Sequence, residues 1–69
     1  MKMATTMKQV AEQLVKDWQA QGVALETMAQ EFNITREDGE WAMQQLGADV
    51  DLNELARECV KVAQGRLDD

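Results

Sequence analysis

The sequence predicts an all-α fold, a compact bundle of about four short helices in a single domain over residues 1–69. Apolar residues recur at helical spacing through most of the chain, and no segment alternates apolar and polar residues for long enough to make a strand. The chain has no proline, and Gly22, Gly47 and Gly65 each follow a periodic segment. Because helices often end at a left-handed glycine, these three residues mark expected helix ends.

The first helix is expected over residues 7–21. Thr6 precedes it as an N-cap, and Gln9, three residues later, completes the pattern of a capping box. The apolar residues of this segment fall on one side of a helix, so they predict a core-facing stripe. Its members are Met7, Val10, Ala11, Leu14 and Trp18.

The second helix is expected over residues 23–32 and the third over residues 36–46. Thr35 is the expected N-cap of the third helix, and Asp38 follows in its first turn, where a carboxylate favours a helix N-terminus. Apolar residues of the second segment have the spacing of one helix face: Leu25, Met28, Ala29 and Phe32.

The fourth helix is expected over residues 52–64. Asp51 is its N-cap, and Glu54 occupies the third position of the helix, as in a capping box. Cys59 lies in line with the leucines and alanines of this segment, so we expect it to be a small buried hydrophobic residue. A regulatory thiol is the alternative, because Arg57 and Lys61 are close to Cys59 in sequence.

At 69 residues, the chain is near the lower size limit for a self-sufficient core. Its apolar residues include nine alanines and five methionines but only one phenylalanine, so each buries little area. One cysteine excludes a disulfide within the chain, and without histidine it leaves no zinc ligand set, so no metal or cofactor is expected. We therefore expect a homodimer, whose seam follows the near-heptad spacing of the first helix: Met3, Met7, Val10 and Leu14.

The formal net charge of −6 is unevenly distributed along the chain. Residues 1–22 carry three basic and two acidic side chains, a net of +1, whereas residues 23–69 carry four basic and eleven acidic ones, a net of −7. This charge disfavours attraction to a nucleic-acid backbone and favours a protein partner with a basic surface. No apolar run approaches the length of a membrane span, and no signal peptide is recognisable at the start, so we expect a soluble, cytoplasmic protein.

Residues 25–46 resemble a helix-turn-helix segment. Ala29 lies in the first helix of this segment, apolar residues flank the turn, and Asn33 occupies the usual glycine position. The resemblance implies a DNA-binding transcriptional regulator, with residues 36–46 as the recognition helix. That helix carries Arg36 alone against three carboxylates, and Gly39 stands where a branched apolar residue is usual. The alternative is a plain packing corner, whose helix lengths resemble those of ubiquitin-associated domains.

Catalysis is not expected from this sequence. The carboxylates lie at helix starts and in a short loop, where capping and the helix dipole explain them. With no histidine, no activated nucleophile and no phosphate-cradling glycine loop, the chain lacks the groups that general acid–base or nucleophilic chemistry requires. We therefore expect a binding protein and not an enzyme.

Trp41 is the expected anchor of a partner-binding face. On the third helix it falls opposite the apolar stripe, with Glu37, Glu40 and Gln44 on the same side. A tryptophan in this position is either covered by the first helix or offered to a partner, and tryptophan is enriched at interface hot spots. The sequence thus favours a small acidic regulator, adaptor or inhibitor that occludes a partner surface. By class-level analogy, bacteria and their phages encode many such proteins.

Overall fold

The computed structural model describes residues 5–68, and all its regular structure over that range is helical. The elements are α1 (Met7–Ala20), α2 (Leu25–Gln30), α3 (Arg36–Leu46) and α4 (Leu52–Leu67). The predicted all-α fold with four helices is therefore confirmed. In this part of the chain, no helix is both long and apolar enough to cross a membrane.

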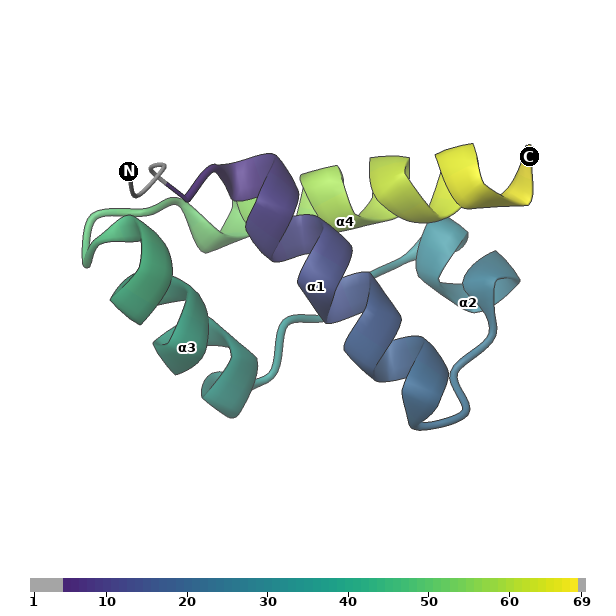
Figure 1. The fold of residues 1–69 in the computed structure, drawn as a ribbon, viewed down its shortest axis with the longest axis horizontal. Coiled ribbons are helices and arrows are strands. Elements are labelled where there is room, and N and C mark those ends of the chain that lie inside the picture. The colour runs from purple at the N-terminus through teal and green to yellow at the C-terminus, as the bar shows by residue number, and fades with distance from the viewer. Residues whose placement is uncertain (1–4, 69) are drawn as a thin grey trace.

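The helix α4 makes the most extensive helix–helix contacts in the fold. It packs against both α1 and α2, whereas α3 has a smaller contact with α1. Figure 1 shows α1 crossing α4, with α2 beneath the C-terminal half of α4 and α3 on the other side of α1. In this view the loop from α2 passes behind α1 to reach the N-terminus of α3 (Figure 1).

The core draws on all four helices. Most of its residues come from α1 and α4, and α3 contributes only Ala42 and the backbone around Gly39. Burial of apolar area, worth about 25 cal/mol per Å², is the main stabilising contribution in a fold of this kind. The buried apolar residues are Val10, Ala11, Leu14, Val15, Met28, Ala29, Phe32, Ala42, Leu55, Cys59 and Ala63.

The start of α1 has the predicted capping box. Thr6 Oγ1 accepts a hydrogen bond from the backbone N–H of Gln9 at 3.2 Å, and Gln9 Oε1 accepts one from the Thr6 N–H at 2.9 Å. The helix ends at Ala20, one residue before the expected end, and Gly22 follows with φ +100°. A left-handed glycine therefore reverses the chain after α1, as the sequence predicts.

The helix α2 is shorter than the segment 23–32 expected from its apolar spacing. Ala24 precedes it without a side-chain cap, and Glu31 is already extended, with φ −155° and ψ 135°. The chain leaves the helix there and places Phe32 in the core at 4% exposure. A helix of six residues is not stable alone. Gln64 of α4 supports it by donating a hydrogen bond from Nε2 to the Ala29 carbonyl at 3.1 Å.

The helix α4 is longer than expected. Its N-cap is Asp51, whose carboxylate accepts hydrogen bonds from the N–H groups of Asn53 and Glu54 at 2.9 and 3.3 Å. The helix continues through Gly65 to Leu67, and positive φ values occur only at Gly22 and Gly47 among the described residues. An interior glycine costs a helix only about 1 kcal/mol, and the packing of α4 on two other helices offsets that cost.

The helix α3 has the expected bounds and ends at Gly47, with φ +105°. Gly39 lies on its inner side, against the start of α4. A Cβ atom placed on Gly39 would lie 3.2 Å from Leu52 Cδ1 and 3.8 Å from Ile34 Cγ2. The residue that departs from the helix-turn-helix pattern is therefore one whose missing side chain leaves room for Leu52 of α4.

Candidate functional site

A groove lies where the C-terminus of α1 meets the N-terminus of α3. Its volume is about 530 Å³. One wall comes from the end of α1 and the turn after it, and the other from the N-cap and first turn of α3. We call it the α1–α3 groove, and its lining residues are Trp18, Gln21, Val23, Thr35, Arg36, Glu37 and Asp38.

Trp18 connects three segments at this groove. Its Nε1–H donates a hydrogen bond of 2.9 Å to Oδ2 of Asp38 in α3. Its ring also stacks on Phe32 of the α2–α3 loop, with 3.9 Å between ring centroids and 20° between the planes. The residue was expected in the core, but it is only half-buried and lies at the edge of the core instead. An indole held on one side by a ring and at its nitrogen by a carboxylate has a fixed orientation.

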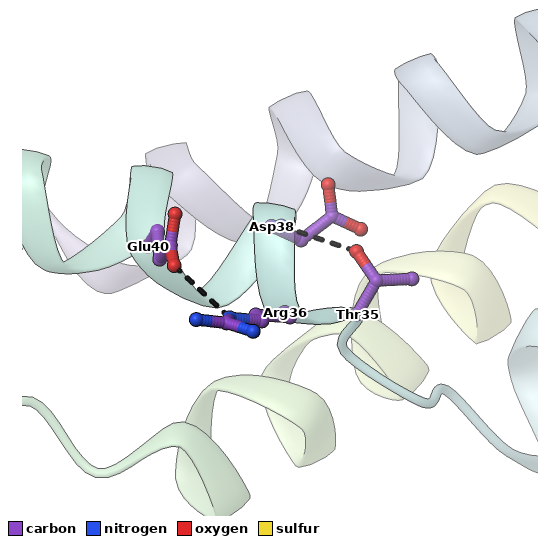
Figure 2. Close-up of polar contacts among 4 residues, drawn as sticks. All are labelled: Thr35, Arg36, Asp38 and Glu40. Carbon is purple, nitrogen blue, oxygen red and sulfur yellow. Dashed lines mark hydrogen bonds and ion pairs between the residues drawn. The ribbon is translucent and has the colours of Figure 1, made fainter.

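The N-cap of α3 forms as predicted, but the carboxylate of Asp38, three residues later, has a partner outside the helix. Thr35 Oγ1 accepts a hydrogen bond from the Asp38 N–H at 3.1 Å. In a capping box, the side chain at this third position would return to the N-cap backbone. Figure 2 shows the bond from the Asp38 backbone to Thr35, whereas the Asp38 carboxylate accepts from the indole N–H of Trp18. The first turn of α3 thereby takes part in a tertiary contact in addition to its local cap.

Arg36 forms an ion pair with Glu40 on the exposed side of α3. Its Nε lies 3.3 Å from Glu40 Oε1, and the two side chains are 92% and 58% exposed. A pair so exposed contributes little to stability. Its effect is on the surface charge, because Glu40 neutralises the one cation between Lys16 and Arg57. Figure 2 shows the guanidinium directed toward Glu40 and away from the Asp38 carboxylate.

The four residues predicted to bind a partner do not share one environment. Glu37, Glu40 and Gln44 are exposed, and Glu37 also lines the α1–α3 groove. Trp41 is half-buried and packs against the core, and it is not among the groove residues. The structure therefore leaves only part of the Trp41 side chain accessible to a partner. The indole at the groove is that of Trp18, which the sequence assigned to packing alone.

The residues predicted for self-association are also divided. Val10 and Leu14 are each 1% exposed, because they form the core of the single chain with α4. Their side chains are therefore not accessible to a second copy in this fold. Met7 is half-buried against the same core, and Met3 lies outside the described residues. Homodimerisation stays a prediction, and a dimer would need a surface other than this stripe.

Cys59 is buried, as expected. Its thiol points to the Ala11 carbonyl, with 3.9 Å between the Sγ and oxygen atoms. Burial, assisted by the nearby carboxylates of Asp38 and Glu58, raises the pKa of the Cys59 thiol from 9.0 to about 12. A thiol that stays protonated and inaccessible is a poor nucleophile, so the structure favours the structural role over the regulatory one.

The cations gather on the side of the molecule formed by α1 and α4. Lys8, Lys61 and Arg66 line a second, mixed-charge groove of about 390 Å³, together with two carboxylates, Glu12 and Glu58. In contrast, α3 carries three carboxylates and one arginine, Arg36, which is paired with Glu40. Within residues 5–68, no group of three or more histidine, cysteine or acidic residues could hold a metal ion.

Comparison of the chain with protein-family models, with curated proteins and with solved structures gave no match.

Proposed function

We propose that this chain is a small protein-binding regulator that acts stoichiometrically, by occupying a basic surface on a partner protein. The binding surface is the exposed face of α3 that carries Glu37, Glu40 and Gln44, together with the adjoining α1–α3 groove, which Glu37 and Asp38 line. Occupation of a partner surface requires no chemistry from this chain, only complementary charge and shape at a well-ordered patch.

One observation carries this proposal, the charge of α3. Arg36 is the only basic residue between Lys16 and Arg57, and it is paired with Glu40 on its own helix. The same stretch, residues 17–56, contains nine acidic residues. Such a surface attracts a basic partner, speeds encounter with it, and repels acidic competitors.

The DNA-binding alternative receives less support from the same elements. A recognition helix places its N-terminal residues against base edges and phosphates, which requires cations and hydrogen-bond donors there. In α3 that end carries Glu37 and Asp38 beside one cation, Arg36, which is paired with Glu40. Five residues separate α2 from α3, and the two helices have at most a marginal contact. Helix-turn-helix motifs join their helices by a turn of about three or four residues.

The proposal is tested by capture of a partner from a lysate of the source organism. The bait pair is the unmodified chain and a Glu37→Lys, Glu40→Lys variant, and mass spectrometry identifies what each retains. A matched control, Glu26→Lys with Glu54→Lys, changes the net charge equally on exposed residues of α2 and α4. We expect one protein to be retained by the unmodified chain and the control but lost with the α3 variant.

A salt titration with duplex DNA tests the alternative. If the unmodified chain binds duplex DNA, and this binding weakens steeply with salt, the result would contradict the proposal and support a DNA-binding regulator. Retention of the same proteins by all three baits would show that the face of α3 is not the binding surface.

A further inference from the structure

The α1–α3 groove combines an oriented indole with two carboxylates, and this combination points to one ligand chemistry. We infer that the groove receives an arginine side chain of the partner protein, with the guanidinium against Trp18 and hydrogen-bonded to Asp38. This inference rests on the proposed function, because it names the partner group that the acidic surface selects.

The aromatic part of the site is already in place before a ligand binds. Trp18 is held by its stack on Phe32 and by its hydrogen bond to Asp38, so its indole cannot rotate freely. Cations are attracted to the face of an indole, and tryptophan is the most effective residue for this contact. Val23, on the same wall of the groove, adds apolar surface for the methylene groups of a long basic side chain. Because these groups need no reordering, binding loses little conformational entropy.

The carboxylates supply the charge and the acceptors. Asp38 uses Oδ2 for the Trp18 indole, and its Oδ1 accepts no hydrogen bond from any group within residues 5–68. Glu37 is the next residue along the same turn, is exposed, and lines the same groove. A guanidinium presents parallel N–H donors that fit carboxylate oxygens, and such charge-assisted bonds are stronger than neutral ones.

Arg36 also lines the groove but does not fill this position. Its Nε is engaged by Glu40 at 3.3 Å, and the guanidinium extends to the opposite side of the first turn from Asp38 (Figure 2). Removal of this charge should therefore leave the affinity for an incoming cation unchanged or raise it.

Arginine fits the site better than lysine. The guanidinium is planar, so it can stack on an indole and donate two hydrogen bonds in its own plane. The lysine ammonium is a compact, strongly hydrated point charge, which gains less from a planar wall. The site therefore predicts discrimination between the two residues, whereas a merely acidic surface would accept both.

The test uses blocked tripeptides, acetyl-Gly-Arg-Gly-amide and its lysine counterpart, titrated into the whole chain at constant ionic strength. Proton–nitrogen correlation spectra report the two indole N–H groups, and a Trp41→Phe variant assigns the signal of Trp18. We expect the arginine peptide to shift the Trp18 indole and the backbone signals of Glu37 and Asp38 in a saturable way. The lysine peptide should bind at least about threefold more weakly.

Two variants complete the test. Asp38→Asn keeps an oxygen that can accept from Trp18 but removes the charge, so it should weaken arginine binding by about fivefold or more. Glu54→Gln makes the same change of net charge on α4, outside the groove, and should leave the affinity unchanged. A melting curve for each variant verifies that the fold persists.

Three results would overturn the inference: equal affinity for the two peptides, equal loss with Asp38→Asn and Glu54→Gln, or shifts that do not saturate. Capture of a partner that depends on Glu37 and Glu40, together with any of these results, would leave the proposed function standing without the arginine site. Selective binding of the arginine peptide without a captured partner would leave the arginine site standing without the proposed function.

Discussion

The indole nitrogen of Trp18 lies 2.9 Å from Oδ2 of Asp38, a residue in the first turn of α3 and twenty positions further along the chain. This bond fastens α3 to the end of α1, and the contact between these two helices is otherwise small. The same bond also fixes the carboxylate and the indole that face the α1–α3 groove. Stability of α3 and order in the groove therefore depend on the same pair of residues.

The coupling between these two residues is measurable by a double-mutant cycle. Trp18→Phe removes the N–H donor and keeps an aromatic ring on Phe32, and Asp38→Ala removes the acceptor. We expect the two changes to be non-additive by about 1 to 2 kcal/mol in the free energy of unfolding, because hydrogen bonds to charged groups contribute more to stability than neutral ones do. Urea unfolding of the four proteins gives the coupling energy. Additive effects would show that the bond contributes nothing in solution.

Two exposed glycines provide a second, matched test. A Cβ atom added to either Gly22 or Gly65 would meet no neighbouring atom within 4 Å, but Gly22 has φ +100° whereas Gly65 is inside α4. Alanine at Gly22 should lower the free energy of unfolding by about 1 kcal/mol or more, because a Cβ is strained at positive φ. Alanine at Gly65 should raise it by about 0.5 to 1 kcal/mol, through helix propensity. Thermal melts that move in the same direction for both variants would contradict this assignment of α4.

The starts of three helices were predictable because capping is local. Thr6, Thr35 and Asp51 each accept backbone hydrogen bonds from residues two or three positions later, so the signal lies within a few letters of sequence. The ends were less predictable. Gly65 has the same residue type as Gly22 and Gly47, and only the packing of α4 determines that the helix continues through it.

The candidate site was less predictable than the fold. The acidic character of α3 is visible in the sequence, and so is the exposure of Glu37 and Glu40 from their helical positions. The contact of Trp18 with Asp38 is not, because it depends on how two separate helices pack. Helical periodicity also cannot distinguish a stripe that packs within one chain from a seam between two chains. Val10 and Leu14 fit the spacing of a seam for that reason, although the chain's own α4 covers them.

Cys59 should react slowly with a thiol reagent in the folded protein. Its side chain is fully buried, so the reagent must wait until the structure opens. We expect the rate with a disulfide reagent at neutral pH to rise at least about a hundredfold in denaturant, where the thiol is accessible. Equal rates with and without denaturant would place Cys59 at the surface and restore its regulatory role.

The same thiol predicts how stability depends on alkaline pH. Burial, assisted by Asp38 and Glu58, raises the pKa of Cys59 from 9.0 to about 12 in the folded protein. Below pH 9.0 the thiol is protonated in both states, and its contribution to stability is fully present. Between the two pKa values the unfolded chain loses its thiol proton and the folded chain keeps it, so the free energy of unfolding should fall by about 1.4 kcal/mol per pH unit.

Cys59→Ala serves as the control, because lysines titrate in both proteins and cancel in the comparison. Urea unfolding across this range should give a steeper decline for the unmodified chain than for the variant. Parallel declines would mean that Cys59 ionises as easily in the folded protein as in the unfolded one.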